Sequence, residues 1–89
     1  MSSEPVAIRV LDREYTVGVE PDERDSLIAA AKLLDGRMRE VRGANRMAAV
    51  DRVAVLAALN LAHELQLLRD ENQARDRELA RTLDGLADL

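Results

Sequence analysis

Residues 48–89 have the sequence AAVDRVAVLAALNLAHELQLLRDENQARDRELARTLDGLADL, and this stretch decides the fold. It contains no proline, and its glycine, Gly85, lies close to the end, so nothing interrupts a helix. A helix of this length extends about 60 Å, at about 1.5 Å per residue. That is far longer than the core of so small a chain requires. The stretch therefore predicts one long helix that its own chain does not wholly bury.

Apolar residues recur along this helix at alternating spacings of three and four, as in the seam of a coiled coil. The apolar face is wide up to Leu68 and then narrows to a single row between charged flanks, in which Asn72 is a polar position that can fix the register. We expect the first half to be buried and the second half to pair with another chain, the alternative being a solvated, frayed helix end. The residues expected at the oligomer interface are Val53, Leu56, Ala57, Asn60, Leu61, Leu65, Leu68, Asn72, Leu79, Leu83 and Leu86.

The composition limits the chain to one small domain. Of its 89 residues 47% are hydrophobic, yet Tyr15 is the only aromatic residue and cysteine is absent. Burial must come from Leu, Val, Ile and Ala, and a monomer with a projecting helix would bury too little surface to offset its chain entropy. We therefore expect an obligate oligomer, with residues 1–66 as a head and residues 67–89 as a coiled-coil extension.

The N-terminal segment predicts a β-hairpin. Val6, Ile8 and Val10 alternate with other residues, and the alternation resumes after residue 13 with Tyr15, Val17 and Val19. A two-residue turn at Asp12-Arg13 would pair Val10 with Tyr15, Ile8 with Val17 and Val6 with Val19. All six side chains would then lie on one face, which must rest on a helix or on another subunit.

A first, shorter helix is expected after Pro21, which suits the first helical position. Gly43 is the expected stop, in the left-handed conformation that ends many helices. Asn45 or Asp51 is expected to cap the next helix. The predicted fold class is α+β: an N-terminal β-hairpin, a short helix, and a long C-terminal helix that forms an intermolecular coiled coil.

Charge is unevenly distributed over a chain whose formal net charge is −4. Five arginines lie between Arg37 and Arg52, against Glu40 and Asp51, whereas the first 25 residues hold seven acids against three arginines. An acidic molecule with a local basic run suits a charged protein partner better than nucleic acid. No segment is long and apolar enough for a membrane span, and no export signal is evident, so we expect a cytoplasmic protein with no membrane partner.

The sequence offers little for catalysis. His63 is the only histidine, and Leu67 stands where a zinc-binding helix would place its second histidine. The serines lack a plausible general base, and the glycines are too scattered to hold a phosphate. We therefore expect a protein that is not an enzyme and that has no cofactor and no metal.

The segment 52–65, RVAVLAALNLAHEL, closely resembles the ZapA family of bacterial Z-ring associated proteins, which carry an A-A-L-N-[LI]-x-x-E-L element. Further similarity lies in Val6-x-Ile8, in the hairpin return at Arg13 and Tyr15, in the Leu27 to Leu34 pattern, and in the segment 38–42, MREVR. The resemblance implies a head made of a hairpin and a short helix, and a long helix that forms a homodimer and often an antiparallel tetramer. It also implies binding to the division GTPase FtsZ at the mid-cell ring, where the protein crosslinks protofilaments.

Family resemblance further implies that FtsZ contacts charged residues of the head, and the matching positions are Arg13, Arg42, Arg46 and Asp51. A solvated surface charge is the alternative at each position. The alternative function is a generic coiled-coil dimerisation module or a small regulator that binds nucleic acid through the basic run. The sequence gives this alternative little support, because it has neither a recognition helix with a continuous basic face nor stacking aromatic residues.

Overall fold

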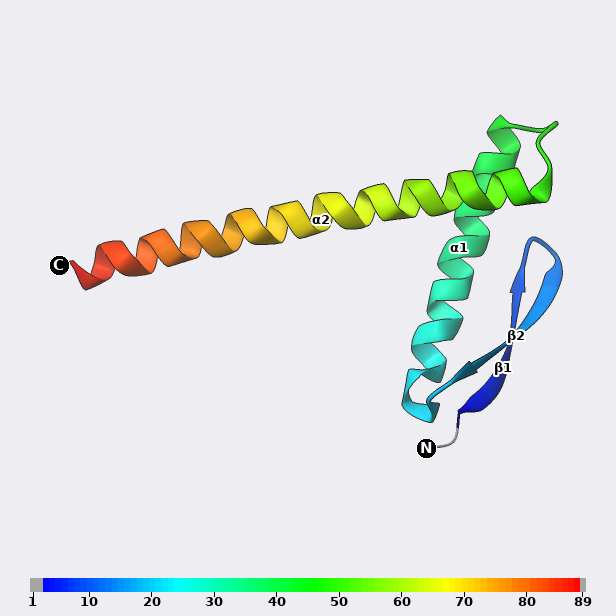
Figure 1. The fold of residues 1–89 in the computed structure, drawn as a ribbon, viewed down its shortest axis with the longest axis horizontal. Helices are drawn as coiled ribbons and strands as arrows, with labels where there is room; N and C mark the ends of the chain where they lie inside the picture. Colours follow the sequence, from blue (N-terminus) through cyan, green and yellow to red (C-terminus); the bar gives the residue numbers. More distant parts are fainter. Residues whose placement is uncertain (1–2, 89) are drawn as a thin grey trace. The chain divides into compact units, whose positions relative to one another are not determined.

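The computed structural model describes residues 3–88. The chain forms β1 (Glu4–Val10), β2 (Arg13–Val19), the 3-10 turn η1 (Pro21–Glu23), α1 (Arg24–Ala44) and α2 (Val50–Ala87), in that order (Figure 1). The predicted α+β class, with a hairpin followed by a shorter and a longer helix, is confirmed. The chain divides into two compact units, a head unit that ends at Ala58 and a helical unit that begins at Leu59. The predicted boundary at residues 66/67, where pairing with another chain would begin, stays a prediction.

The hairpin has the predicted apolar face but a different register. Val10 pairs with Arg13, Ile8 with Tyr15 and Val6 with Val17, so the predicted turn at Asp12-Arg13 is wrong. The turn residues are Leu11 and Asp12, both with positive φ (47° and 65°), as a tight two-residue hairpin turn requires. Leu11 is buried, and its burial offsets the cost of placing a non-glycine residue in this conformation. Moving the turn by one residue shifts each pairing by two, so the same side chains stay on one face.

Two predictions about helix ends are wrong. Gly43 lies inside α1, and no glycine in the described chain has a positive φ, so Gly43 does not end the helix. Asn45 ends it instead: the backbone N–H of Asn45 donates to the Arg42 carbonyl (3.1 Å), and its side-chain Nδ2 donates to the Val41 carbonyl (2.9 Å). Neither Asn45 nor Asp51 caps α2. The helix begins at Val50, five residues after Asn45, and Asp51 already lies in its first turn.

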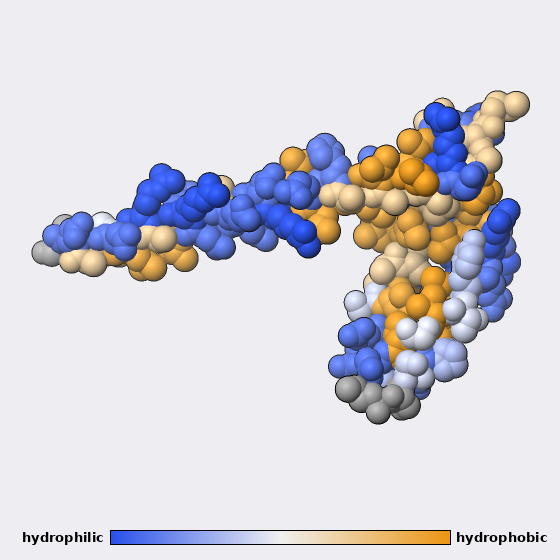
Figure 2. All heavy atoms as spheres, viewed as in Figure 1, coloured by the Kyte–Doolittle hydropathy of each residue, from blue (hydrophilic) through white to orange (hydrophobic). Residues whose placement is uncertain are grey.

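The core lies in the head unit, where β1, α1 and the first turns of α2 meet. Its main cluster consists of Val10, Leu11, Met38, Val53 and Ala57, with further apolar residues packed around it. Among the described residues, only Val6 and Ala31 add to the buried hydrophobic set. This is a small core, so much of the apolar surface of the head remains open to solvent. Figure 2 shows hydrophobic residues gathered over α1 and the start of α2.

Candidate functional site

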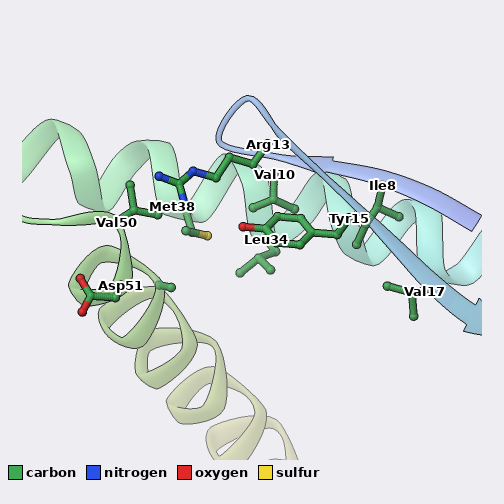
Figure 3. A pocket seen from close by; sticks show the side chains of 10 residues that line it. Ile8, Val10, Arg13, Tyr15, Val17, Leu34, Met38, Val50 and Asp51 are labelled. Carbon is green, nitrogen blue, oxygen red and sulfur yellow. The ribbon is translucent and has the colours of Figure 1, made fainter.

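An open, mostly apolar groove lies on the head unit. Its volume is about 490 Å³, and side chains from the hairpin, from α1 and from the first turns of α2 line it (Figure 3). The hairpin face contributes because β-strand alternation turns Ile8, Tyr15 and Val17 to the same side. The lining residues are Ile8, Val10, Arg13, Tyr15, Val17, Leu34, Met38, Val50, Asp51 and Ala54.

Two opposite charges, Arg13 and Asp51, are the charged members of this lining. Arg13 is the first residue of β2, and Asp51 lies in the first turn of α2, so they belong to different walls (Figure 3). Both side chains are exposed, and within the described chain neither forms an ion pair or a hydrogen bond through its charged group. The structure thus brings together two of the four charged residues that the sequence singled out.

The hairpin turn is held on α1 by a hydrogen-bonded network. The Leu11 backbone N–H donates to Asp35 Oδ1 (2.8 Å), Arg39 Nε donates to Asp35 Oδ2 (3.0 Å), and Arg39 Nη2 donates to Asp12 Oδ1 (3.1 Å). The hydrogen bond from the Leu11 N–H has the largest effect on Asp35 and the one from Arg39 the next largest, and both hold the pKa of Asp35 below its ordinary value. The hydrogen bonds to Asp35 and then Asp12 raise the pKa of Arg39. Because Arg13 directly follows this turn, the network also positions Arg13 at the groove.

The role of Asp35 was not predicted from the sequence. The available signal was the spacing of four between Asp35 and Arg39, which places both on one helix face. Their joint contact with the turn was not visible, because it spans 24 residues from Leu11 to Asp35.

A second candidate surface lies where α1 ends and α2 begins. Arg42 is in the last turn of α1, Arg46 is in the connection, and Arg52 is in the first turn of α2. Arg46 and Arg52 line an open cleft of about 510 Å³ together with Asn45, Ala48, Ala49 and Met47, whose surface is 99% exposed. By contrast, Arg37 Nε lies 3.9 Å from Glu40 Oε2, and Arg39 forms ion pairs with Asp35 and Asp12. The basic run is thus partly neutralised within the chain, and its positive charge is concentrated at this end.

The residues expected at the oligomer interface fall into three groups. Val53 and Ala57 are 1% and 0% exposed, because the chain's own core covers them. Leu56 and Leu61 are half-buried. The remaining members of the row are exposed, and they are Asn60, Leu65, Leu68, Asn72, Leu79, Leu83 and Leu86.

Six leucines of the helical unit form two matching triplets, Leu61, Leu65 and Leu68 and then Leu79, Leu83 and Leu86. The second triplet follows the first after 18 residues (79 − 61), which is about five helical turns of 3.6 residues. Corresponding leucines therefore lie at the same angle around the helix, so the row stays on one face of a straight helix. Asn72 lies between the triplets, in the mostly polar stretch that separates them.

The described chain holds no group of three or more potential metal ligands. In the same part of the chain, no helix is long and apolar enough to cross a membrane.

Together these features define a class of protein: a small α+β head followed in the chain by a long helix with an exposed row of leucines. The chain belongs to the ZapA family of cell-division proteins. The family model, described as Cell division protein ZapA, matches residues 6–89. Because this family is non-enzymatic, the chain is not an enzyme, as the sequence predicted.

Individual relatives agree with this assignment. Cell division protein ZapA of Pseudomonas aeruginosa strain PAO1 is 40% identical over 84 residues, which cover 91% of this chain and 81% of the relative. A solved structure described as an unknown conserved bacterial protein from Pseudomonas aeruginosa PAO1 has a TM-score of 0.71 and 39% identity, and the match covers 97% of this chain and 98% of that one. A ZapA mutant dimer from Geobacillus stearothermophilus has a TM-score of 0.68 and 26% identity, covering 89% and 91%.

Proposed function

We propose that this protein binds FtsZ and crosslinks or stabilises its protofilaments in the Z-ring at mid-cell, in the cytoplasm. Membership of the ZapA family supports the role in division. The observation that carries the crosslinking part is the exposed leucine row of the helical unit. A crosslinker needs at least two binding heads on one body, and the row provides a surface through which copies can join.

Self-association is the first step of this proposal. The chain forms a homodimer, and two dimers form an antiparallel tetramer through residues 67–89. A similar protein was solved as a dimer, which supports the first stage. Exposed leucines repeated along one face would be costly to leave in water, because each buries favourably against an apolar partner. Two heads on one assembly then bind a filament lattice with avidity, even where each contact is weak.

The contact with FtsZ is the second step, and we assign it mainly to the basic end of the head unit. Arg42 and Arg46 are exposed there, and no ion pair within the described chain neutralises them. Met47 adds a fully exposed apolar side chain beside Arg46, which can enter a pocket on a partner. Arg13 and Asp51, the other two candidates, line the groove instead.

Co-sedimentation with FtsZ polymers tests this proposal. The double variant Arg42→Glu/Arg46→Glu should lose filament binding and bundling while keeping its oligomeric state, because exposed charges contribute little to folding. Arg9→Glu/Arg24→Glu is the matched control, since it makes the same change in net charge at two exposed arginines, one in β1 and one in the first turn of α1. Wild-type protein that fails to co-sediment with FtsZ would contradict the function. A double variant that binds as well as the control would contradict the assigned surface.

A DNA shift assay at physiological salt separates this proposal from the regulator alternative. Engagement of Arg37 and Arg39 with neighbouring acids leaves less positive charge for a nucleic-acid contact. We therefore expect no shift.

A further inference from the structure

We propose that Met47 is a site of reversible oxidation, at which a peroxide converts the thioether to a sulfoxide and thereby weakens the contact between the basic end of the head unit and its partner. Met47 lies in the connection between α1 and α2. The oxidation depends only on the head unit, whereas its effect on binding rests on the proposed function, which places FtsZ at this end.

The first argument is the contrast between two methionines. Of the three in the chain, Met38 and Met47 lie among the described residues. Met47 is 99% exposed, whereas Met38 is 4% exposed and belongs to the core cluster. A dissolved oxidant reaches an exposed thioether directly, but it reaches a buried one only when the core opens. Met47 should therefore be oxidised about tenfold or more faster than Met38 while the protein stays folded.

The second argument is the charge around Met47. Arg46 and Arg52 line the same cleft and are exposed, and no ion pair within the described chain neutralises either of them. In the oxidation, the sulfur attacks one oxygen of the peroxide, so that an S–O bond forms as the O–O bond breaks. The sulfur gives up two electrons, and the departing hydroxide takes the proton of the new S–OH group and leaves as water. Positive charge stabilises the negative charge that develops on the departing oxygen, so the two guanidinium groups favour the reaction here.

The third argument is the change in the contact surface. Met47 has the one long apolar side chain of this cleft, because the other lining residues are arginine, asparagine or alanine. Oxidation converts this side chain into a polar one, which is costly to move from water into an apolar pocket of a partner. The oxidised protein should therefore bind FtsZ about tenfold or more weakly. Methionine sulfoxide reductases restore the thioether, so the change is reversible.

Oxidation of Met47 should leave the fold intact, unlike general oxidative damage. Its side chain is open to solvent in the turn between the helices, so the added oxygen displaces no core contact. Oxidation of Met38 would instead place a polar group among Val10, Leu11 and Val53 and destabilise the head. Loss of binding without loss of fold is thus the signature expected of Met47.

Controlled oxidation followed by peptide mapping tests the proposal. The full chain is treated with hydrogen peroxide, quenched with free methionine and desalted before it is mixed with untreated FtsZ polymers. Mass spectrometry of its peptides at successive times gives the oxidation rate of each methionine. Circular dichroism and sedimentation equilibrium check fold and oligomeric state, and co-sedimentation measures binding. Treatment with methionine sulfoxide reductases should restore the binding that oxidation removed.

Two leucine variants assign the effect to one residue, since leucine replaces methionine with little change in volume. Each variant is compared with itself before and after peroxide treatment. Met47→Leu should show no change in FtsZ binding on treatment, whereas Met38→Leu should lose binding as the wild type does. Met1, which lies outside the described residues, is kept in both variants. An effect of its oxidation would therefore appear in Met47→Leu.

Three results would overturn the proposal: oxidation of Met47 no faster than that of Met38, undiminished binding by oxidised wild type, or an equal loss of binding by treated Met47→Leu. Failure of the untreated wild type to co-sediment with FtsZ would contradict the proposed function instead. Peptide mapping needs no FtsZ, so it would still decide whether Met47 is the site of oxidation.

Discussion

Adjacent leucines in the helical unit provide a matched test of the interface row. Leu67 and Leu68 are 51% and 56% exposed in the single chain, so substituting either should change the stability of a monomer by a similar amount. They point about 100° apart around the helix. Leu68 belongs to the row that we expect to face a partner, and Leu67 does not. Truncating each to alanine therefore separates a true interface from general surface hydrophobicity.

The expected magnitude follows from the surface still available for burial. Complete burial of a leucine contributes about 1.5 to 3 kcal/mol, and 56% of Leu68 is still exposed in the single chain. Its burial at an interface therefore contributes about 0.8 to 1.7 kcal/mol per protomer. A two-fold contact between copies loses this twice, so Leu68→Ala should raise the dissociation constant of that contact about 15- to 300-fold.

Sedimentation equilibrium measures both dissociation constants, and circular dichroism checks that both variants remain helical. Because the two substitutions are identical in chemistry and differ by one position, their effect on helix propensity cancels in the comparison. Leu67→Ala should leave dissociation nearly unchanged. Equal effects of the two substitutions, or no effect of Leu68→Ala, would refute the assignment of the row.

Three further predictions concern other parts of the chain. Asp35→Asn should loosen the hairpin turn and lower the melting temperature at neutral pH. Because the pKa of Asp35 lies below its ordinary value of 3.8, the higher melting temperature of the wild type should be present above that pH and should disappear as the pH falls through the lowered pKa. Thermal melts of both proteins from pH 7 to 2 check this, and parallel curves would contradict it. Asn72→Leu should raise the melting temperature but broaden the distribution of oligomers seen by native mass spectrometry; a lower melting temperature would show that Asn72 does not face a helix. Truncation before Leu79 should preserve FtsZ binding by the heads but reduce bundling seen by light scattering, and undiminished bundling would exclude residues 79–89 from the crosslinking assembly.

The hairpin shows which part of a sheet the sequence specifies. Strand alternation fixes the face of each side chain, so the apolar face could be predicted although the turn was placed one residue too far. The choice of turn depended on contacts distant in sequence. Leu11 is buried against the core, and its N–H is held by Asp35, so two non-glycine residues accept positive φ where local preference alone gave no such indication.

The candidate site was predictable residue by residue but not as a surface. Arg13 and Asp51 came from the family resemblance, yet the groove that contains them is built by three segments far apart in the chain. The apolar row of α2 poses a related difficulty. Its periodicity predicts that these side chains are buried, but it does not say whether the same chain or another chain covers them. Val53 and Ala57 are covered by their own head, whereas Leu65 and Leu68, in the same row, are exposed.

The leucine row can join two chains directly or join two dimers into a tetramer, and the two cases differ in measurable ways. If the row joins two chains, Leu68→Ala should convert the assembly to monomers. If the row joins dimers, Leu68→Ala should leave dimers at protein concentrations at which the wild type is a tetramer. A contact made by leucines should weaken little as salt rises, because salt screens charges and not apolar contacts. Sedimentation equilibrium of wild type and Leu68→Ala at low and high salt therefore identifies which stage of assembly the row holds together.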